Sequence, residues 1–324
     1  MGTREKVLML FEKNKGRYIS GEEIAGSLDV SRTSVWKAVN RLRSEGYIID
    51  SVTNKGYCLS EETDILSAQG IYKYLDDMCV LPGIEVLPVT GSTNTYLSIK
   101  AGEGAEDGYT VVANGQTCGR GRAGKTFFSP DGTGIYMSIL LRPEMCSADH
   151  ALRITTMAAV AMCEAIEEVS DKRPEIKWVN DIFINDRKVC GILTEASFSL
   201  EGGFLDYAVL GLGINVYRPE NGFPDDIKDT AGSIYEDSRK DLKNRLAAAF
   251  LNDFMRYYRN DSMDYTAKYR SYSLLINKKV VIIKGDRREN AEVYDINDDC
   301  RLCVRYEDGS TEELGYGEVQ IVNQ

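Results

Sequence analysis

The chain has 324 residues, of which 43% are hydrophobic, and its formal net charge is −11. This length predicts two or three domains with apolar cores. No segment approaches the ~20 apolar residues that a membrane-spanning helix needs, and the first residues lack the apolar run of a secretory signal. The eight cysteines are scattered along the chain. We therefore expect a cytoplasmic protein with free thiols and no membrane partner.

His150 is the only histidine, and this excludes much catalytic chemistry. Histidine-rich metal sites are excluded, and a Ser-His-Asp device would have to use His150, which we expect in a helix after Ser147. Cys300 and Cys303 form a C-x-x-C pair without a second pair or a nearby histidine, so a metal site is not expected there. Catalysis should depend on lysine, arginine, carboxylates and bound magnesium.

The first sixty residues carry the pattern of a winged helix-turn-helix. Apolar periodicity predicts helices over residues 5–15, 20–28 and 32–44. Ser20 with Glu23 forms a capping box, and Ser31 can cap the third helix. Strand-like runs over 47–52 and 56–59 then predict a hairpin, the wing. Residues 1–60 carry a net charge of +3 whereas the remainder carries −14, as expected for a nucleic-acid-binding end.

Residues that read DNA bases in such motifs cluster at the start of the recognition helix. The helix 32–44 turns Val35, Val39 and Leu42 inward and leaves polar residues outside. The alternative is a helical packing module with ordinary surface charge. The DNA-binding candidates are Ser31, Arg32, Thr33, Ser34, Lys37, Asn40, Arg41 and Lys55.

Residues 119–126, G-R-G-R-A-G-K-T, match the P-loop pattern letter for letter. A P-loop also needs a strand before it and a helix directly after it. The strand is predicted at 109–113, but Pro130 and two glycines follow the loop, and the run 135–141 is typical of another strand. We therefore favour an anion-binding loop over a P-loop NTPase. Its glycines permit left-handed dihedrals, close backbone approach and a nest of backbone N–H groups, while Arg120 and Arg122 supply forked donors. A solvated basic loop is the alternative.

A second segment, Lys177-Trp178-Val179-Asn180-Asp181, opens a predicted hairpin that turns at 185–187. The hairpin brings Lys188 alongside Asn180 and Asp181. Residues 210–216 are typical of a buried strand with a bend at its glycines. Ser92-Thr93-Asn94 follows the predicted strand 85–89 and can cap a helix.

These two segments, together with the helix-turn-helix, resemble the bifunctional biotin–protein ligases, which also repress the biotin operon. The resemblance covers nearly the whole chain and implies an α/β (α+β) protein. It implies a winged helix-turn-helix over residues 1–62, a central mixed-sheet ligase domain over 63–272, and an SH3-like C-terminal β-barrel over 273–324. The tail match is the loosest part.

The resemblance also implies the site residues. The catalytic residues would be Lys188, Arg122 and Arg120. Biotin would be bound by Ser92, Thr93, Asn94, Gln116, Arg120, Gly121, Arg122, Lys188 and Gly191. The nucleotide would be bound by Gly119, Arg122, Lys125, Phe127, Asn180, Asp181, Lys188 and Asn215.

Three positions depart from the family pattern. Lys125 replaces an arginine, Phe127 replaces a tryptophan, and Val179 replaces the proline of Lys-Trp-Pro-Asn-Asp. Lys125 can still attract phosphate, although it lacks the planar, forked guanidinium of an arginine. Phe127 can still stack on adenine, with a smaller contact area than a tryptophan. We expect changed loop rigidity and retained activity.

The activity implied is ATP-dependent conversion of biotin to biotinyl-5'-AMP with Mg²⁺, followed by transfer to a lysine of a biotin carboxyl carrier protein. The adenylate-bound chain would form a homodimer that binds operator DNA. Three alternatives stay open: a ligand-sensing transcription factor without turnover, a lipoate or octanoate ligase, and a P-loop NTPase.

Overall fold

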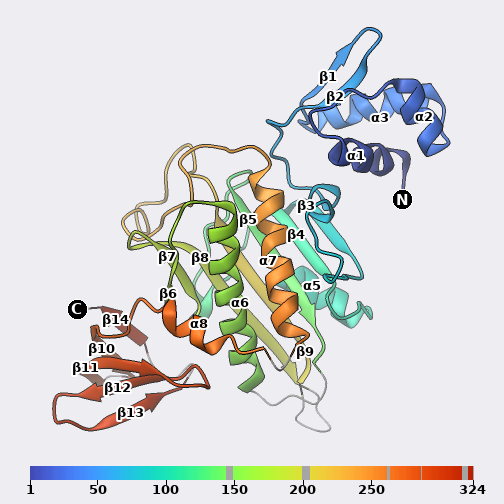
Figure 1. Cartoon of the computed structure of the whole chain (residues 1–324). Coiled ribbons are helices and arrows are strands. Elements are labelled where there is room, and N and C mark those ends of the chain that lie inside the picture. Colours follow the sequence, from blue (N-terminus) through green and yellow to red (C-terminus); the bar gives the residue numbers. More distant parts are fainter. Residues whose placement is uncertain (144–148, 199–204, 261–262, 286, 316–319, 324) are drawn as a thin grey trace. The chain divides into compact units, whose positions relative to one another are not determined.

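A computed structural model describes residues 1–143, 149–198, 205–260, 263–285, 287–315 and 320–323 (Figure 1). The chain forms two compact units. The first comprises Met1–Asp77 and Asp237–Leu251, and the second comprises Met78–Glu236 and Asn252–Gln324. The predicted domain boundaries remain a prediction.

The N-terminal segment of the first unit confirms the predicted winged helix-turn-helix. Its elements are α1 (Thr3–Lys13), α2 (Gly21–Leu28), α3 (Arg32–Ser44), β1 (Ile49–Val52) and β2 (Gly56–Leu59). The hydroxyl of Ser20 accepts the backbone N–H of Glu23 at 3.1 Å, and that of Ser31 accepts the N–H of Ser34 at 3.1 Å. The first helix ends two residues earlier than predicted, before Gly16, whose φ is +80°.

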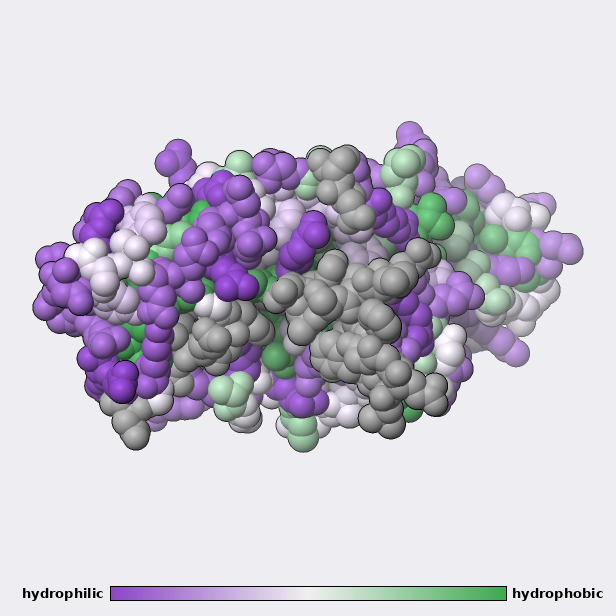
Figure 2. Space-filling model, turned by 90° about the horizontal axis from the view of Figure 1, so that it is seen from below, coloured by the Kyte–Doolittle hydropathy of each residue, from purple (hydrophilic) through white to green (hydrophobic). Residues whose placement is uncertain are grey.

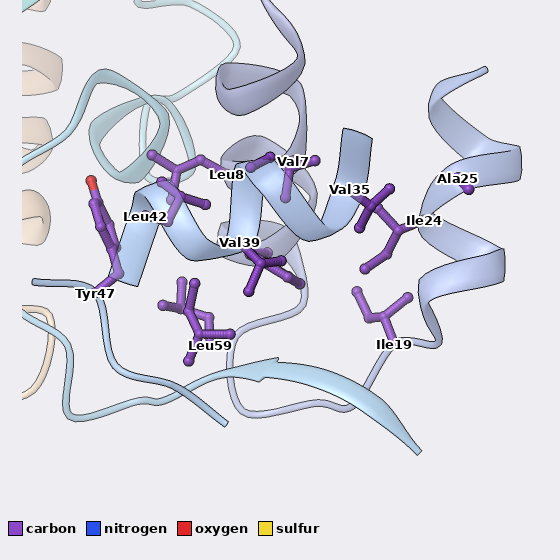
Figure 3. Close-up of a cluster of buried hydrophobic side chains, with 13 residues drawn as sticks. Val7, Leu8, Ile19, Ile24, Ala25, Val35, Val39, Leu42, Tyr47 and Leu59 are labelled. Carbon is purple, nitrogen blue, oxygen red and sulfur yellow. The ribbon is translucent and has the colours of Figure 1, made fainter. Parts of the chain in front are cut away.

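Apolar side chains from all three helices and the wing form one core (Figure 3). Val35, Val39 and Leu42 of α3 are buried as predicted, and they meet Leu8 of α1 and Ile24 of α2. Because this core occupies the inner face of α3, the outer face of that helix stays available for a partner.

Residues 61–64, Glu-Glu-Thr-Asp, have the polar composition expected of a linker, but they are packed against a distant helix. Asp64 accepts the backbone N–H of Lys243 at 2.9 Å, at the start of α7 (Leu242–Tyr258). The sequence pattern of residues 65–78 predicts one helix, but this prediction is wrong in extent, since only α4 (Ala68–Tyr72) forms. The side chain of Asn244 accounts for the late start of this helix, because it hydrogen-bonds the backbone of Ile65 and Ser67.

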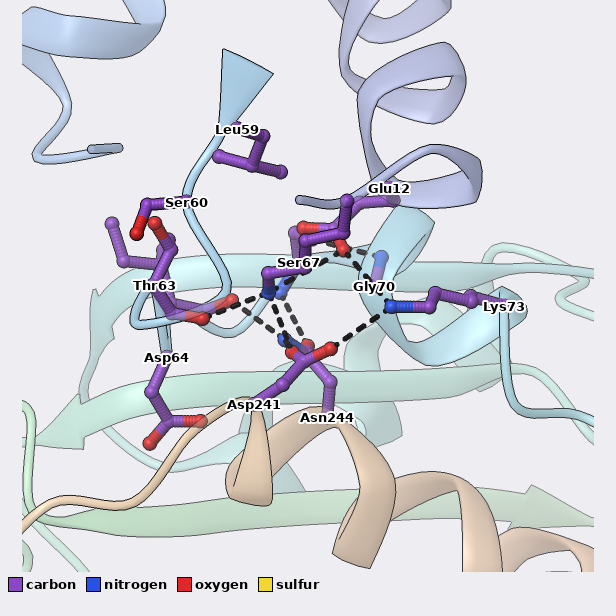
Figure 4. A network of polar contacts seen from close by, with 12 residues as sticks. Glu12, Leu59, Ser60, Thr63, Asp64, Ser67, Gly70, Lys73, Asp241 and Asn244 are labelled. Carbon is purple, nitrogen blue, oxygen red and sulfur yellow. Dashed lines mark hydrogen bonds and ion pairs between the residues drawn. The ribbon is translucent and has the colours of Figure 1, made fainter. Parts of the chain in front are cut away.

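A buried ionic cluster joins α1, α4 and the start of α7 within this unit (Figure 4). The carboxylate of Asp241 lies 3.0 Å from Lys15 Nζ and 3.2 Å from Lys73 Nζ. Burial alone would raise the pKa of Asp241, but hydrogen bonds from Asn244 and Tyr74 and the charge of Lys15 outweigh it, so this pKa is lowered. Burial raises the pKa of the neighbouring Glu12.

The second unit is built on a seven-stranded sheet of order β3-β4-β5-β9-β8-β7-β6. The strands are β3 (Ile84–Thr90), β4 (Thr110–Gln116), β5 (Gly134–Leu141), β6 (Glu175–Lys177), β7 (Asp181–Ile184), β8 (Arg187–Phe198) and β9 (Leu205–Asn215). Only the β3–β4 pair is parallel among these strands. The predicted mixed sheet is therefore confirmed.

Helices lie on both faces of this sheet. On one face, α5 (Thr93–Gly102) packs on the central strands. On the other, α6 (Asp149–Val169) packs on β8, where Thr155 Oγ1 lies 2.7 Å from Thr194 Oγ1. Glu195 follows Thr194 and therefore points to the α5 face. Ser147, which we predicted before α6, lies outside the described residues. The helices α7 and α8 (Thr266–Ser271) were not predicted.

The C-terminal segment is a small antiparallel β domain, as predicted. Its five strands, in the sheet order β13-β12-β11-β10-β14, are β10 (Lys279–Lys284), β11 (Arg287–Ile296), β12 (Leu302–Tyr306), β13 (Thr311–Leu314) and β14 (Gln320–Asn323). Asp308-Gly309, a pair that favours a hairpin turn, lies between β12 and β13, with a φ of +85° at the glycine.

On the face seen in Figure 2, hydrophobic residues occur in small groups between hydrophilic ones. In the described part of the chain, no helix has the length and apolar character needed to cross a membrane.

Candidate functional site

A cavity of about 410 Å³ opens on the α5 side of the seven-stranded sheet. This volume lies within the range of small-molecule sites. The cavity is strongly cationic, because its described lining includes one carboxylate, Asp181, against five basic side chains. These are Arg120, Arg122, Lys125, Lys177 and Lys188. The cavity is therefore suited to an anionic ligand.

Most of the residues singled out in the sequence meet at this cavity. Those that line it are Ser92, Thr93, Asn94, Gln116, Arg120, Gly121, Arg122, Lys125, Phe127, Asn180, Asp181, Lys188 and Gly191. Two candidates, Gly119 and Asn215, are not among its described lining residues. Asn215 is buried and donates from Nδ2 to the carbonyl of Gly232 at 3.0 Å.

The glycine loop between β4 and β5 forms a tight hairpin. The N–H of Gly121 donates to the carbonyl of Lys125 at 2.7 Å, and the N–H of Phe127 donates to that of Gly119 at 2.9 Å. The tip turns through Ala123 and Gly124, whose φ values are +52° and +73°. The N–H of Gly121 is thus used inside the hairpin and is not available for the expected nest.

Two of the loop's three glycines fit the expectation that glycine allows left-handed dihedrals and close backbone approach. Of the three, Gly124 has a left-handed backbone. Gly119 is needed for close approach, because a Cβ there would lie 2.3 Å from the carbonyl oxygen of Phe127. After the loop the chain continues into β5, with only the three-residue 3₁₀ turn Arg122–Gly124 between β4 and β5. The P-loop alternative is therefore wrong, because it requires a helix directly after the loop.

Two side chains tether this hairpin over the cavity. Arg122 Nη1 donates to Asn180 Oδ1 at 2.9 Å, and Asn180 in turn donates to the carbonyl of Ile192 at 2.8 Å. Arg120 Nη2 lies 2.8 Å from a carboxylate oxygen of Glu195. A charge-assisted hydrogen bond and an ion pair thus help to hold the loop.

Uncharged hydrogen-bonding groups line the end of the cavity formed by α5 and β4. The backbone N–H of Thr93 donates to Gln116 Oε1 at 2.8 Å. Gln116 Nε2 donates to the hydroxyl of Ser129 at 3.0 Å. Ser92, as predicted, caps α5, accepting the N–H of Thr95 at 3.5 Å. This end offers donors and acceptors without net charge.

Asn94 is occupied by protein partners. Its Nδ2 donates to Glu195 at 2.8 Å and to the carbonyl of Leu193 at 3.3 Å, while Ser138 donates to its Oδ1 at 2.6 Å. Gly211 makes the space, because a Cβ there would lie 2.1 Å from Asn94 Oδ1. Sequence reasoning missed Ser138 and Glu195. Two signals were available. Ser138 is a serine inside an apolar strand, and the alternation of side chains along a strand directs the Glu195 carboxylate to the α5 face.

The predicted β7–β8 hairpin is confirmed, and it places Lys188 beside Asp181. The turn residues Asn185 and Asp186 have φ values of +50° and +59°. Lys188 Nζ lies 2.6 Å from Asp181 Oδ1, and each side chain is roughly one-third exposed at the cavity. The ammonium is thereby oriented by an opposite charge while it stays accessible.

Hydrogen bonds from the C-terminal β domain and from α8 support the second motif. Trp178 lines the cavity, and its Nε1 donates to the carbonyl of Cys300 at 2.9 Å. The hydroxyl of Tyr269 donates to the carbonyl of Val179 at 3.0 Å. The segment that carries Asn180 and Asp181 is therefore fixed by hydrogen bonds on both sides.

The outer face of α3 is basic and contains an exposed aromatic residue. Arg32–Ser44 holds four basic residues and no acidic one. Arg41 pairs with Glu45 at 3.1 Å, and Arg43 donates to the carbonyl of Ile49. Trp36, which the sequence reasoning passed over, is 56% exposed on this helix. The predicted candidates that are exposed are Ser31, Arg32, Thr33, Lys37, Arg41 and Lys55, while Ser34 and Asn40 are half-buried.

Comparisons with known proteins agree with this geometry. Residues 86–215 match the Biotin/lipoate A/B protein ligase family, residues 3–58 match an HTH domain, and residues 275–322 match the Biotin protein ligase C terminal domain. The chain is 38% identical over 231 residues to the bifunctional ligase/repressor BirA of Bacillus subtilis (strain 168), covering 71% of this chain and 70% of that protein. It belongs to the biotin–protein ligase family.

Other relatives extend the likeness. The BirA protein of Escherichia coli (strain K12) is 29% identical over 277 residues, covering 84% of this chain and 83% of that protein. A solved structure, biotin protein ligase from Aquifex aeolicus in complex with biotin and ATP, superposes with a TM-score of 0.63 at 25% identity. It covers 75% of this chain and all of that one.

The departures from the family pattern can be located in this ligase-family chain. Lys125 and Phe127 both line the cavity, so neither substitution removes a residue from it. The ring of Phe127 lies against Gly213 and Gly191 and is edge-on to Tyr136, with ring centroids 6.5 Å apart. Val179 is buried. Which ligand atoms each lining residue binds stays a prediction.

Proposed function

We propose that this chain joins biotin to ATP, forming biotinyl-5'-AMP and pyrophosphate, and then transfers biotin to a lysine of a biotin carboxyl carrier protein. One observation supports this most. A single cavity combines an uncharged hydrogen-bonding end, around Thr93 and Gln116, with a cationic end around Arg122 and Lys188. A urea ring suits the first end, and a carboxylate meeting a triphosphate suits the second.

In the first step, an oxygen of the biotin carboxylate attacks the α-phosphorus of ATP, and the bond to pyrophosphate breaks. Both reactants are anions, so their approach requires positive charge. Lys188, Arg120 and Arg122 supply it and stabilise the charge on the phosphorus oxygens in the transition state. The 2.6 Å contact with Asp181 keeps the Lys188 ammonium in place before the substrates arrive.

The donor set fits a magnesium ion that enters with ATP. Magnesium is usually bound through one or two carboxylates together with substrate phosphates and water. Asp181 is the carboxylate that the described cavity lining offers. When bound there, magnesium would neutralise phosphate charge.

In the second step, the amine of the carrier lysine attacks the acyl carbon of the mixed anhydride. The amide bond forms, the bond to AMP breaks, and one proton is released. The tethered glycine loop would limit entry of water, which would otherwise hydrolyse the anhydride. We place this reaction in the cytoplasm.

The adenylation step is tested by pyrophosphate release in the presence of Mg²⁺ and the absence of carrier protein. The proposal predicts release of about one equivalent per chain with biotin, because biotinyl-AMP stays bound. Octanoate and lipoate should give none. Release with octanoate or lipoate instead of biotin would make the chain an acyl ligase. Tight binding of biotin without release would make it a ligand sensor.

We further propose that the chain represses transcription when it carries biotinyl-AMP. The support is the winged helix-turn-helix with a basic outer face on α3 and Lys55 in the wing, to which we add Trp36 as a contact with DNA. A homodimer would place two recognition helices on the two halves of an operator. Sedimentation with and without biotinyl-AMP tests this: an unchanged monomer–dimer constant would contradict the coupling.

A further inference from the structure

The carboxylate of Glu195 joins two different parts of the cavity wall. One oxygen lies 2.8 Å from Arg120 Nη2, on the glycine loop. The other accepts a hydrogen bond from Asn94 Nδ2 at 2.8 Å, in the first turn of α5. Glu195 itself belongs to β8, so three separate elements meet at this carboxylate.

The position of Glu195 is fixed from its inner side. Asn94 cannot turn its amide without losing partners, because Ser138 donates to its oxygen and Leu193 accepts from its nitrogen. Asn94 also occupies the space left by Gly211, so its side chain has little freedom. The Glu195 carboxylate is therefore a rigid anchor, whereas Arg120 comes from a loop and is 52% exposed.

We propose that Glu195 is a positioning residue, which holds Arg120 and the first arm of the glycine loop over the cavity before substrates bind. Arg122 and Asn180 tether the second arm. A loop that is already ordered loses less conformational entropy when the ligand binds. Loss of the Glu195 tether should therefore weaken biotin binding more than it slows chemistry. This kinetic consequence rests on the proposed function, but the tether itself does not.

Glu195→Gln isolates the tether, because glutamine keeps the shape and can still accept from Asn94 while it loses the charge. The first readout is trypsin cleavage after Arg122 in the ligand-free full chain. We expect cleavage about fivefold faster in Glu195→Gln than in the wild type. Glu103→Gln is the matched control, because Glu103 also forms an ion pair, with Lys100 Nζ at 2.8 Å, but Lys100, unlike Arg120, is not among the described lining residues of the cavity. Equal cleavage in the wild type and Glu195→Gln would overturn the proposal.

The second readout is the split between KM and kcat in biotin-dependent pyrophosphate release. Glu195→Gln should raise the KM for biotin about fivefold and leave kcat within about twofold. In an Arg120→Ala background, Glu195→Gln should have no further effect on biotin affinity, measured by equilibrium dialysis. The same loss in both backgrounds would mean that Glu195 does not act through Arg120. If the wild type released no pyrophosphate while the cleavage result held, the proposed function would fail and the tether would stand.

Discussion

The ring of Phe127 occupies space that a glycine leaves at position 213, where a Cβ atom would lie 2.4 Å from Phe127 Cε1. Gly213 pairs in register with Gly191 on the adjacent strand, and a Cβ at Gly191 would also approach this ring, to 3.1 Å. The two glycines thus form a flat patch of backbone beneath Phe127. The glycines of strand β9 therefore leave space at this site for the aromatic side chain of Phe127 from the loop.

Gly213→Ala should displace Phe127 and weaken ATP binding. Under the proposed function Phe127 stacks on adenine, and stacking of this kind contributes about 1–3 kcal/mol. We therefore expect the KM for ATP to rise roughly tenfold, with a smaller change in the KM for biotin. Gly102→Ala is the control, because nothing lies within 4 Å of a Cβ at that position. An unchanged KM for ATP in Gly213→Ala would show that Phe127 is not at the nucleotide.

Lys188→Ala should nearly abolish adenylation. The lysine places positive charge where the phosphorus oxygens become more negative, and removal of one such group costs about 100-fold or more in rate. Single-turnover pyrophosphate release measures the effect directly. Lys100→Ala, on the exposed side of α5, should retain the wild-type rate. A wild-type rate in Lys188→Ala would remove this lysine from the mechanism.

Trp36 should become shielded when DNA binds. The chain has two tryptophans. Trp178 is buried, with only 8% of its surface exposed, so a change in the quenching of tryptophan fluorescence by acrylamide reports mainly on Trp36. We expect a mixed-sequence DNA duplex at low salt, where non-specific binding is strong, to reduce quenching. The change should disappear in Trp36→Phe. If saturating DNA leaves the quenching of the wild type as it was, the outer face of α3 is not the DNA-binding face.

Asp241→Asn should loosen the packing of α1 against α4 and α7. Asparagine fits the left-handed backbone at this position, where φ is +49°, but it removes the charge that faces Lys15 and Lys73. Loss of one partner from a buried ion cluster costs about 3 kcal/mol. Faster hydrogen–deuterium exchange in α1 should reveal this loss at neutral pH.

The pH dependence of this effect has a definite sign. The pKa of Asp241 is lowered on folding. The Asp241 carboxylate therefore contributes to the stability of the fold above the ordinary pKa of 3.8, and this stability is lost as the pH falls below that value. The exchange rates of Asp241→Asn and the wild type should therefore converge in acid. Glu12, whose pKa is raised, acts in the opposite sense, because ionisation of its carboxyl as pH rises costs stability. A difference between Asp241→Asn and the wild type that persists at low pH would contradict this assignment.

Local signals in the sequence predicted the elements that are determined locally. Ser20 and Ser31 begin helices where capping residues were expected, and the β7–β8 hairpin turns where Asn185-Asp186 indicated. The hairpin then placed Lys188 beside Asp181 without any tertiary information. The strand after the glycine loop was also predictable, because Pro130 and its neighbouring glycines disfavour a helix.

Features that depend on contacts between distant residues could not be predicted. The late start of helix α4 follows from Asn244, which lies more than 170 residues further along the chain than Ser67. The roles of Gly211 and Gly213 depend on which side chains approach them from α5 and the loop. Glu195 was missed for the same reason, since its partners Asn94 and Arg120 come from other parts of the chain.

The most direct test of the proposed activity follows the α-phosphate of ATP. The chain is incubated with biotin, Mg²⁺ and ATP labelled at the α-phosphorus, and bound nucleotide is separated by gel filtration. We expect the label to stay on the protein as biotinyl-AMP and to be released as AMP when a biotin carrier domain is added and becomes biotinylated. Retention of label without biotin, or no retained label with it, would contradict biotin adenylation at this cavity.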